Sequence, residues 1–178
     1  MDKQTICDLL EETLEAAGNG IFSHLDIEAE YIDSSELGMH DFACSVGFTS
    51  LTLRGNLTLT AHRAFVAETR PPELRTAAEA TEMELADWIG ELGNQLLGRF
   101  KNKLIPSGNV IELGTPAVLS GFQIVRCGGR MPLSVARLAR TSAGTLAMHV
   151  DAQASEGFTI AEQDSANEVM PEGELALF

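Results

Sequence analysis

Residues 81–104 read TEMELADWIGELGNQLLGRFKNKL and form the strongest structural signal in the chain. Large apolar residues recur every three or four positions, which predicts one long helix over about residues 82–104 with one buried side. The apolar residues on that side are Leu85, Ile89, Leu92, Leu96 and Phe100. Thr81 and Glu84 have the spacing of a capping box, in which two residues exchange hydrogen bonds around the first turn, so we expect the helix to begin there. The Pro-Ser-Gly sequence at 106–108 is expected to end it.

The other side of this helix carries a polar stripe. At about 100° per residue, Asp87, Glu91 and Asn94 fall within roughly 40° of one another. Gly90 and Gly98 flank the stripe, where a missing side chain lets another surface approach closely, although each glycine costs roughly 1 kcal/mol relative to alanine in a helix. A solvated helix face is the alternative explanation. Such faces usually carry good helix formers, however, rather than an asparagine between glycines, so the pattern favours a docking site.

Patterns outside this helix predict two further helices and a sheet. Helical spacing predicts a helix through residues 6–17, with Gly18-Asn19-Gly20 as its stop, and a short helix at 62–70. Alternation of apolar and polar residues predicts strands, the first three of which are expected to form an antiparallel meander. The expected strands are residues 25–31, 42–48, 51–59, 110–113, 122–126, 133–138 and 146–150. This order predicts an α+β domain, with an antiparallel sheet and helices on one of its faces.

The length of 178 residues favours a single domain with a substantial core, which we expect to span residues 1–151. Residues 152–178 are acidic and contain few large apolar residues before the last four. We interpret them as a C-terminal extension that is either flexible or packed on the sheet.

Composition and charge narrow the functional classes. With 44% hydrophobic and 21% charged residues, the chain is typical of globular proteins. Its formal net charge of −14 argues against a nucleic-acid partner, because phosphate binding needs a basic surface. The longest apolar runs are far shorter than the roughly 20 residues that cross a bilayer, and the N-terminus lacks the apolar region of a signal peptide. We therefore expect a cytoplasmic protein without a membrane span.

Motifs for metal, nucleotide or nucleophilic chemistry are missing from the sequence. The four histidines are scattered without H-x-H or H-E-x-x-H spacing, and the three cysteines lack C-x-x-C spacing. No G-x-S-x-G, Walker A or G-x-G-x-x-G sequence is present. We expect no metal site and no cofactor in this chain.

Three segments resemble the CheX branch of the CheC/CheX/FliY phosphatases. They are residues 84–86 (ELA), 89–94 (IGELGN) and 111–121 (IELGTPAVLSG), with Gly98 between the second and the third. In the family that these segments resemble, the pattern is an acid or serine, three residues, Glu, two residues, Asn, and a proline about 22 residues further on. Here these positions hold Asp87, Glu91, Asn94 and Pro116. A single copy of the motif is similar to CheX rather than to CheC, although the Pro71-Pro72 segment and the long acidic extension depart from a minimal CheX domain.

The resemblance implies a phosphatase that acts on the aspartyl phosphate of a CheY-type response regulator. By this resemblance Asn94 orients the attacking water and Glu91 pairs with the active-site lysine of the receiver domain. Asp87, at the first motif position, orients or docks the receiver, and Pro116 shapes the loop beside the helix. Mg²⁺ is expected in the receiver domain, held by its own carboxylates, rather than in this chain. CheX-like domains typically form homodimers through their sheets, so a homodimer is expected here as well.

Two other functions remain open at this point. A non-catalytic CheX-like module could bind a phosphorylated receiver, or another signalling partner, without turnover. A purely structural dimer module is the third interpretation, and it leaves the glycine-flanked polar stripe unexplained. Turnover of a phosphorylated receiver separates the first function from the second, and phosphorylation-dependent binding separates the second from the third.

Overall fold

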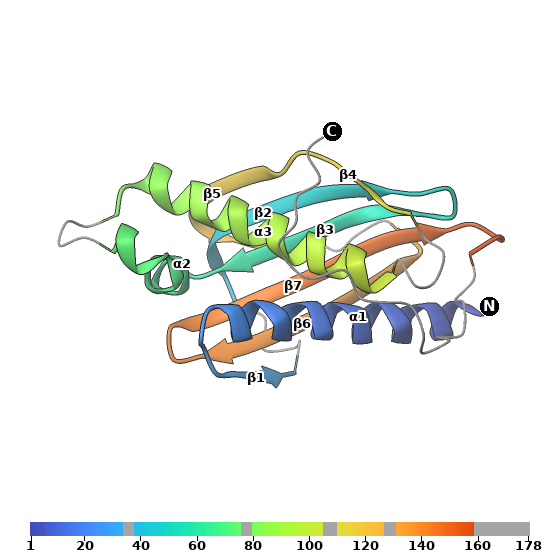
Figure 1. Ribbon diagram of the computed structural model, residues 1–178, viewed down its shortest axis with the longest axis horizontal. Coiled ribbons are helices and arrows are strands. Elements are labelled where there is room, and N and C mark those ends of the chain that lie inside the picture. Colours follow the sequence, from blue (N-terminus) through green and yellow to red (C-terminus); the bar gives the residue numbers. More distant parts are fainter. Residues whose placement is uncertain (34–37, 76–79, 105–109, 127–130, 159–178) are drawn as a thin grey trace.

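A computed structural model describes residues 1–33, 38–75, 80–104, 110–126 and 131–158. It shows an α+β domain in which helices cover one face of a seven-stranded antiparallel sheet, as the sequence predicts (Figure 1). The helices are α1 (Lys3–His24), α2 (Arg63–Thr69), a short 3-10 helix (Pro72–Leu74) and α3 (Glu82–Leu104). The strands are β1 (Ala29–Ile32), β2 (His40–Thr49), β3 (Leu53–Ala61), β4 (Glu112–Leu113), β5 (Ala117–Ile124), β6 (Leu133–Thr141) and β7 (Gly144–Ala154).

The strands are ordered β1-β6-β7-β3-β2-β4, and β5 also pairs with β2. The predicted meander is therefore correct for the β2–β3 hairpin and wrong for β1, which pairs with β6 at the far edge. The placement of β1 follows from its contact with α1. Tyr31 of β1 donates a hydrogen bond from its hydroxyl to the backbone oxygen of Glu15, 3.0 Å away, which holds the strand against the helix.

Helix α1 does not stop at Gly18-Asn19-Gly20, and this prediction is wrong. A Cβ atom added at Gly18 would lie 2.7 Å from the Tyr31 hydroxyl and 2.8 Å from Met148 Cε of β7. At Gly20 the nearest atom would be a guanidinium nitrogen of Arg99 on α3, at 3.1 Å. These glycines therefore let β1, β7 and α3 approach the helix closely. The helix ends at His24, and the chain turns shortly afterwards.

The core lies between the helices and one face of the sheet. Alternate residues of the central strands face the helices, including Phe48 of β2, whose ring centroid lies 5.8 Å from that of Phe100 on α3. Strand β3 begins two residues later than predicted, and Leu51 is fully exposed in the turn before it. Trp88 of α3 is buried and donates a hydrogen bond from Nε1 to Thr69 Oγ1, 3.0 Å away, which joins α3 to α2.

The strands after α3 have other bounds than the sequence predicts. Strand β5 covers residues 117–124 rather than 122–126, and β4 is only two residues long. Most β5 side chains are exposed, so no apolar alternation marks the start of this strand. Strand β7 continues past residue 151 to Ala154, and Phe158 is buried in the core. The rest of the expected extension (residues 159–178) and the predicted helix stop at 106–108 lie outside the described residues.

Candidate functional site

Helix α3 lies on the sheet between α1 and β5 and also packs against α2 (Figure 1). The predicted capping box is present at its start. The backbone N–H of Thr81 donates to Glu84 Oε2 at 2.7 Å, and the backbone N–H of Glu84 donates to Thr81 Oγ1 at 3.3 Å. The hydrogen bonds from Thr81 lower the pKa of the Glu84 carboxyl. Arg63 of α2 forms an ion pair with Glu82, so the first turn of α3 is held from two sides.

The structure brings Asp87, Glu91 and Asn94 together on the outer side of α3, where all three are exposed. We call this set the polar stripe. Within the described part of the chain, the side chains of Asp87 and Asn94 take part in no hydrogen bond or ion pair. This acid and this amide, exposed and without such bonds to the described residues, are candidates for contact with a partner.

Three glycines of α3 have different surroundings, which the sequence alone does not distinguish. A Cβ atom at Gly93 would lie 2.4 Å from Cys44 Sγ on β2, and one at Gly90 would lie 3.2 Å from Val118 Cγ2 on β5. These two glycines are buried and let the sheet approach the helix. A Cβ atom at Gly98 would meet no atom of the described residues within 4 Å beyond the helix's own nearby backbone. At about 100° per residue, Gly98 lies in line with the polar stripe, one turn beyond Asn94.

Pro116 immediately precedes β5, the strand that packs against α3. Val118, two residues later, pairs with Cys44 of β2 and faces Gly90. The loop before Pro116 is held to β2 by a hydrogen bond from the Gly114 N–H to the Gly47 carbonyl oxygen, at 2.8 Å. The last motif position is thus placed on the β5 side of α3, beside its middle.

One residue near the stripe was not singled out from the sequence. Gln95 donates a hydrogen bond from Nε2 to Glu91 Oε1 at 2.9 Å. The two residues are four apart in a helix, a spacing that brings side chains together, so this signal was present in the sequence.

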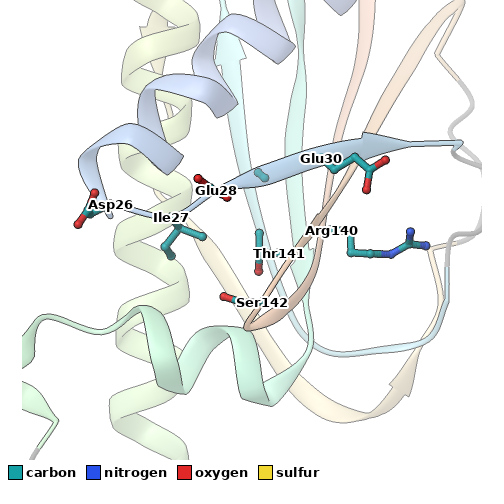
Figure 2. Close-up of a pocket in the computed structure, with 8 residues that line it drawn as sticks. Asp26, Ile27, Glu28, Glu30, Arg140, Thr141 and Ser142 are labelled. Atoms are coloured by element: carbon teal, nitrogen blue, oxygen red, sulfur yellow. The ribbon is translucent and has the colours of Figure 1, made fainter.

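The polar stripe is separate from two shallow hollows on the described surface. The larger, of about 550 Å³, lies where α1 leads into β1 and is lined mostly by polar residues (Figure 2). Its lining residues include Asp26, Glu28, Glu30, Arg140, Thr141 and Ser142. The second is lined by residues of β2, β3 and the β4 region. Small-molecule sites are usually concave, so an exposed stripe on a helix suits insertion into a partner's cavity better.

Two absences hold for the part of the chain that the structure describes. No group of three or more His, Cys, Asp and Glu side chains is placed to hold a metal ion. None of the helices there combines the length and the apolar composition that crossing a bilayer requires.

The antiparallel sheet with helices on one face is an α+β fold that this chain shares with solved structures of CheX and CheC-like proteins. A model of the family described as "Chemotaxis phosphatase CheX" matches residues 42–138, and the chain belongs to this family. No curated protein sequence gives a match.

Solved structures share the fold at low sequence identity. CheX from Vibrio vulnificus has a TM-score of 0.69 at 18% identity, over 79% of this chain and 93% of that chain. CheX from Desulfovibrio desulfuricans has a TM-score of 0.64 at 18% identity, over 81% and 99%. A CheX–CheY–BeF3–Mg²⁺ complex from Borrelia burgdorferi has a TM-score of 0.63 at 15% identity, over 80% and 96%.

Proposed function

We propose that this protein dephosphorylates the aspartyl phosphate of a CheY-type receiver domain. The observation that carries the proposal is the exposed pair Glu91 and Asn94 on α3. Gly98 lies in line with this pair, and no packing contact with the described residues requires a glycine there. Membership of the CheX family supports it. The shared fold with the CheX of a CheX–CheY complex supports a receiver domain as the partner.

Asn94 is the proposed catalytic residue. An aspartyl phosphate is already a reactive acyl phosphate, so the main task is to place a water in line with the phosphorus. A side-chain amide both donates to and accepts from that water, and it does not ionise. Asn94 suits this task because its side chain is exposed and makes no hydrogen bond to the described residues.

Glu91 is proposed to bind the active-site lysine of the receiver, while Asn94 reaches the phosphoryl group. A carboxylate three residues before the amide lies on the same side of the helix, and an ammonium–carboxylate hydrogen bond is stronger than a neutral one. Asp87 would orient or dock the receiver at the first turns of α3, and Pro116 would shape the loop on the β5 side.

Gly98 is proposed to allow the receiver's backbone to approach the helix. Gly90 was predicted to have the same role, but its packing against Val118 supplies a reason inside the chain. Gly90 therefore contributes by letting β5, and with it Pro116, lie close to α3. The Mg²⁺ ion that the reaction uses would be bound by the receiver's carboxylates, since hard cations prefer oxygen ligands.

We also propose a homodimer that uses the outer side of β5. Among the described residues this strand pairs with β2 alone, and three large apolar side chains on or beside it are exposed: Leu119, Phe122 and Val125. Burial of such side chains is a common driving force for association. Light scattering should give twice the chain mass for the wild type, and a Phe122→Glu variant should shift toward the monomer. A monomeric wild type would refute the dimer.

The phosphatase is tested by phosphate release from CheY-type receivers of the same cell, phosphorylated with acetyl phosphate and Mg²⁺. We expect the wild type to accelerate phosphate release and the Asn94→Ala variant not to accelerate it. Acceleration by Asn94→Ala at the wild-type rate would refute the role of this residue. If no receiver is dephosphorylated but a phosphorylated receiver binds, the protein is a binding module rather than an enzyme.

A further inference from the structure

We infer that Gln95 is a positioning residue for Glu91 and thereby sets how well the receiver's lysine is bound. This inference rests on the proposed function, because it assigns Gln95 a part in the same docking step. Gln95 itself would touch neither the phosphoryl group nor the water.

The geometry joins the two side chains across one turn of α3. Gln95 Nε2 donates to Glu91 Oε1 at 2.9 Å, and this is the only hydrogen bond of the Glu91 side chain to the described residues. Oε2 of the same carboxylate thus keeps its capacity to accept. An ammonium group of a partner can bind there without displacing Gln95.

The other end of the Gln95 amide points into the protein rather than into solvent. Oε1 is buried and has no hydrogen-bond partner within the described part of the chain. A glutamine that turned into solvent would satisfy this oxygen with water, and leaving it unpaired is unfavourable. Exchanging the two amide ends would place an oxygen against the Glu91 carboxylate, where two acceptors repel. Gln95 is therefore held with its NH2 group toward Glu91.

The consequence for binding is entropic. An exposed glutamate on a helix samples several rotamers, and a partner that binds one of them must freeze the others. The hydrogen bond from Gln95 restricts these rotamers before the receiver arrives. Preorganisation of this kind strengthens binding without adding a contact to the partner. Its loss should therefore raise KM and leave kcat nearly unchanged.

The test is a double-mutant cycle with a CheY-type receiver phosphorylated by acetyl phosphate. Gln95→Met keeps the length and helix propensity of the side chain and removes the donor. We expect it to raise KM roughly 2- to 10-fold and to change kcat less than about 2-fold. In a Glu91→Ala background the same substitution should have no further effect on KM, because the residue that it positions is gone.

Helix α1 offers a matched control. Gln4 donates from Nε2 to Asp8 Oδ1 at 2.7 Å, with the same i to i+4 spacing on another helix. Gln4→Met should leave KM unchanged. An equal rise of KM in the presence and absence of Glu91, or a fall of kcat with KM intact, would overturn the positioning role. A wild type that neither dephosphorylates nor binds any receiver would overturn the proposed function, and this inference with it.

Discussion

Gly93 of α3 lies directly against Cys44 of β2, so closely that a Cβ atom at residue 93 would stand 2.4 Å from Cys44 Sγ. Cys44 is fully buried, and burial raises the pKa of its thiol to about 11. This contact determines how deeply the middle of α3 sits on the sheet. Since Asn94 follows Gly93 and successive helical residues are about 100° apart, the same contact turns Asn94 away from the sheet.

Gly93→Ala should therefore destabilise the protein. The added methyl overlaps the Cys44 side chain, and overpacking a core typically costs about 1–3 kcal/mol, of which helix propensity returns up to about 1 kcal/mol. Urea denaturation should show the loss as a lower midpoint. Adding Cys44→Ala makes room for the methyl. The double variant should therefore lose less unfolding free energy than the two single variants lose in sum. A stabilised Gly93→Ala would contradict the close contact.

Gly98→Ala should have the opposite effect on stability and should still harm function. Beyond the helix's own nearby backbone, no atom of the described residues lies within 4 Å of the position that its Cβ would take, so the helix gains up to about 1 kcal/mol. The methyl would nevertheless stand in line with Asn94, where the receiver is proposed to approach. We expect a higher melting temperature together with slower phosphate release from a phosphorylated receiver. Unchanged turnover would remove Gly98 from the docking surface.

The sequence does not predict that Gly93 and Gly98 have different surroundings in the structure. Helix α3, its capping box and its polar stripe follow from local signals, namely a 3.6-residue period and the Thr81–Glu84 spacing. Whether a glycine in that helix serves internal packing or a partner depends on which strand lies opposite. Val118, which faces Gly90, is 28 positions away along the chain. No local pattern contains that relationship.

The same reason explains the errors in the fold. Gly18 and Gly20 look like a helix stop, but Tyr31, Met148 and Arg99 approach them from distant parts of the chain. The placement of β1 beside β6 is equally non-local. Gln95 is a different case, because its spacing from Glu91 is local and the hydrogen bond could have been predicted from the sequence.

Acid should destabilise the fold through His149, which is buried on β7 with both ring nitrogens unpartnered among the described residues. Burial, with Arg126 nearby, lowers its pKa from 6.5 to about 4. As pH falls from about 6.5 to 4, the unfolded chain binds a proton at this residue and the folded protein does not, so stability is lost in that window.

His149→Leu tests this directly. Between pH 7.5 and pH 5, His149 should lower the free energy of unfolding of the wild type by about 2 kcal/mol. The leucine variant should not show this part of the loss. His40 should continue to contribute in both proteins, since burial lowers its pKa to about 4 as well. Urea denaturation of wild type and variant at pH 7.5 and pH 5.0 provides the comparison. Parallel losses in the two proteins would show that His149 is not the cause.

Asn94→Ala and Glu91→Ala should separate catalysis from docking. Both side chains are exposed, so neither change should alter the melting temperature by much. If Asn94 only orients the water, its loss should abolish turnover while the affinity for a receiver loaded with beryllofluoride and Mg²⁺ stays within about 3-fold of wild type. If Glu91 binds the receiver's lysine, its loss should weaken that affinity by roughly 10-fold or more and slow turnover as well.

Calorimetric titration measures the affinities, and phosphate release measures the turnover. Equal loss of affinity in both variants would mean that Asn94 is part of the docking contact, and the division of roles between the two residues would be wrong.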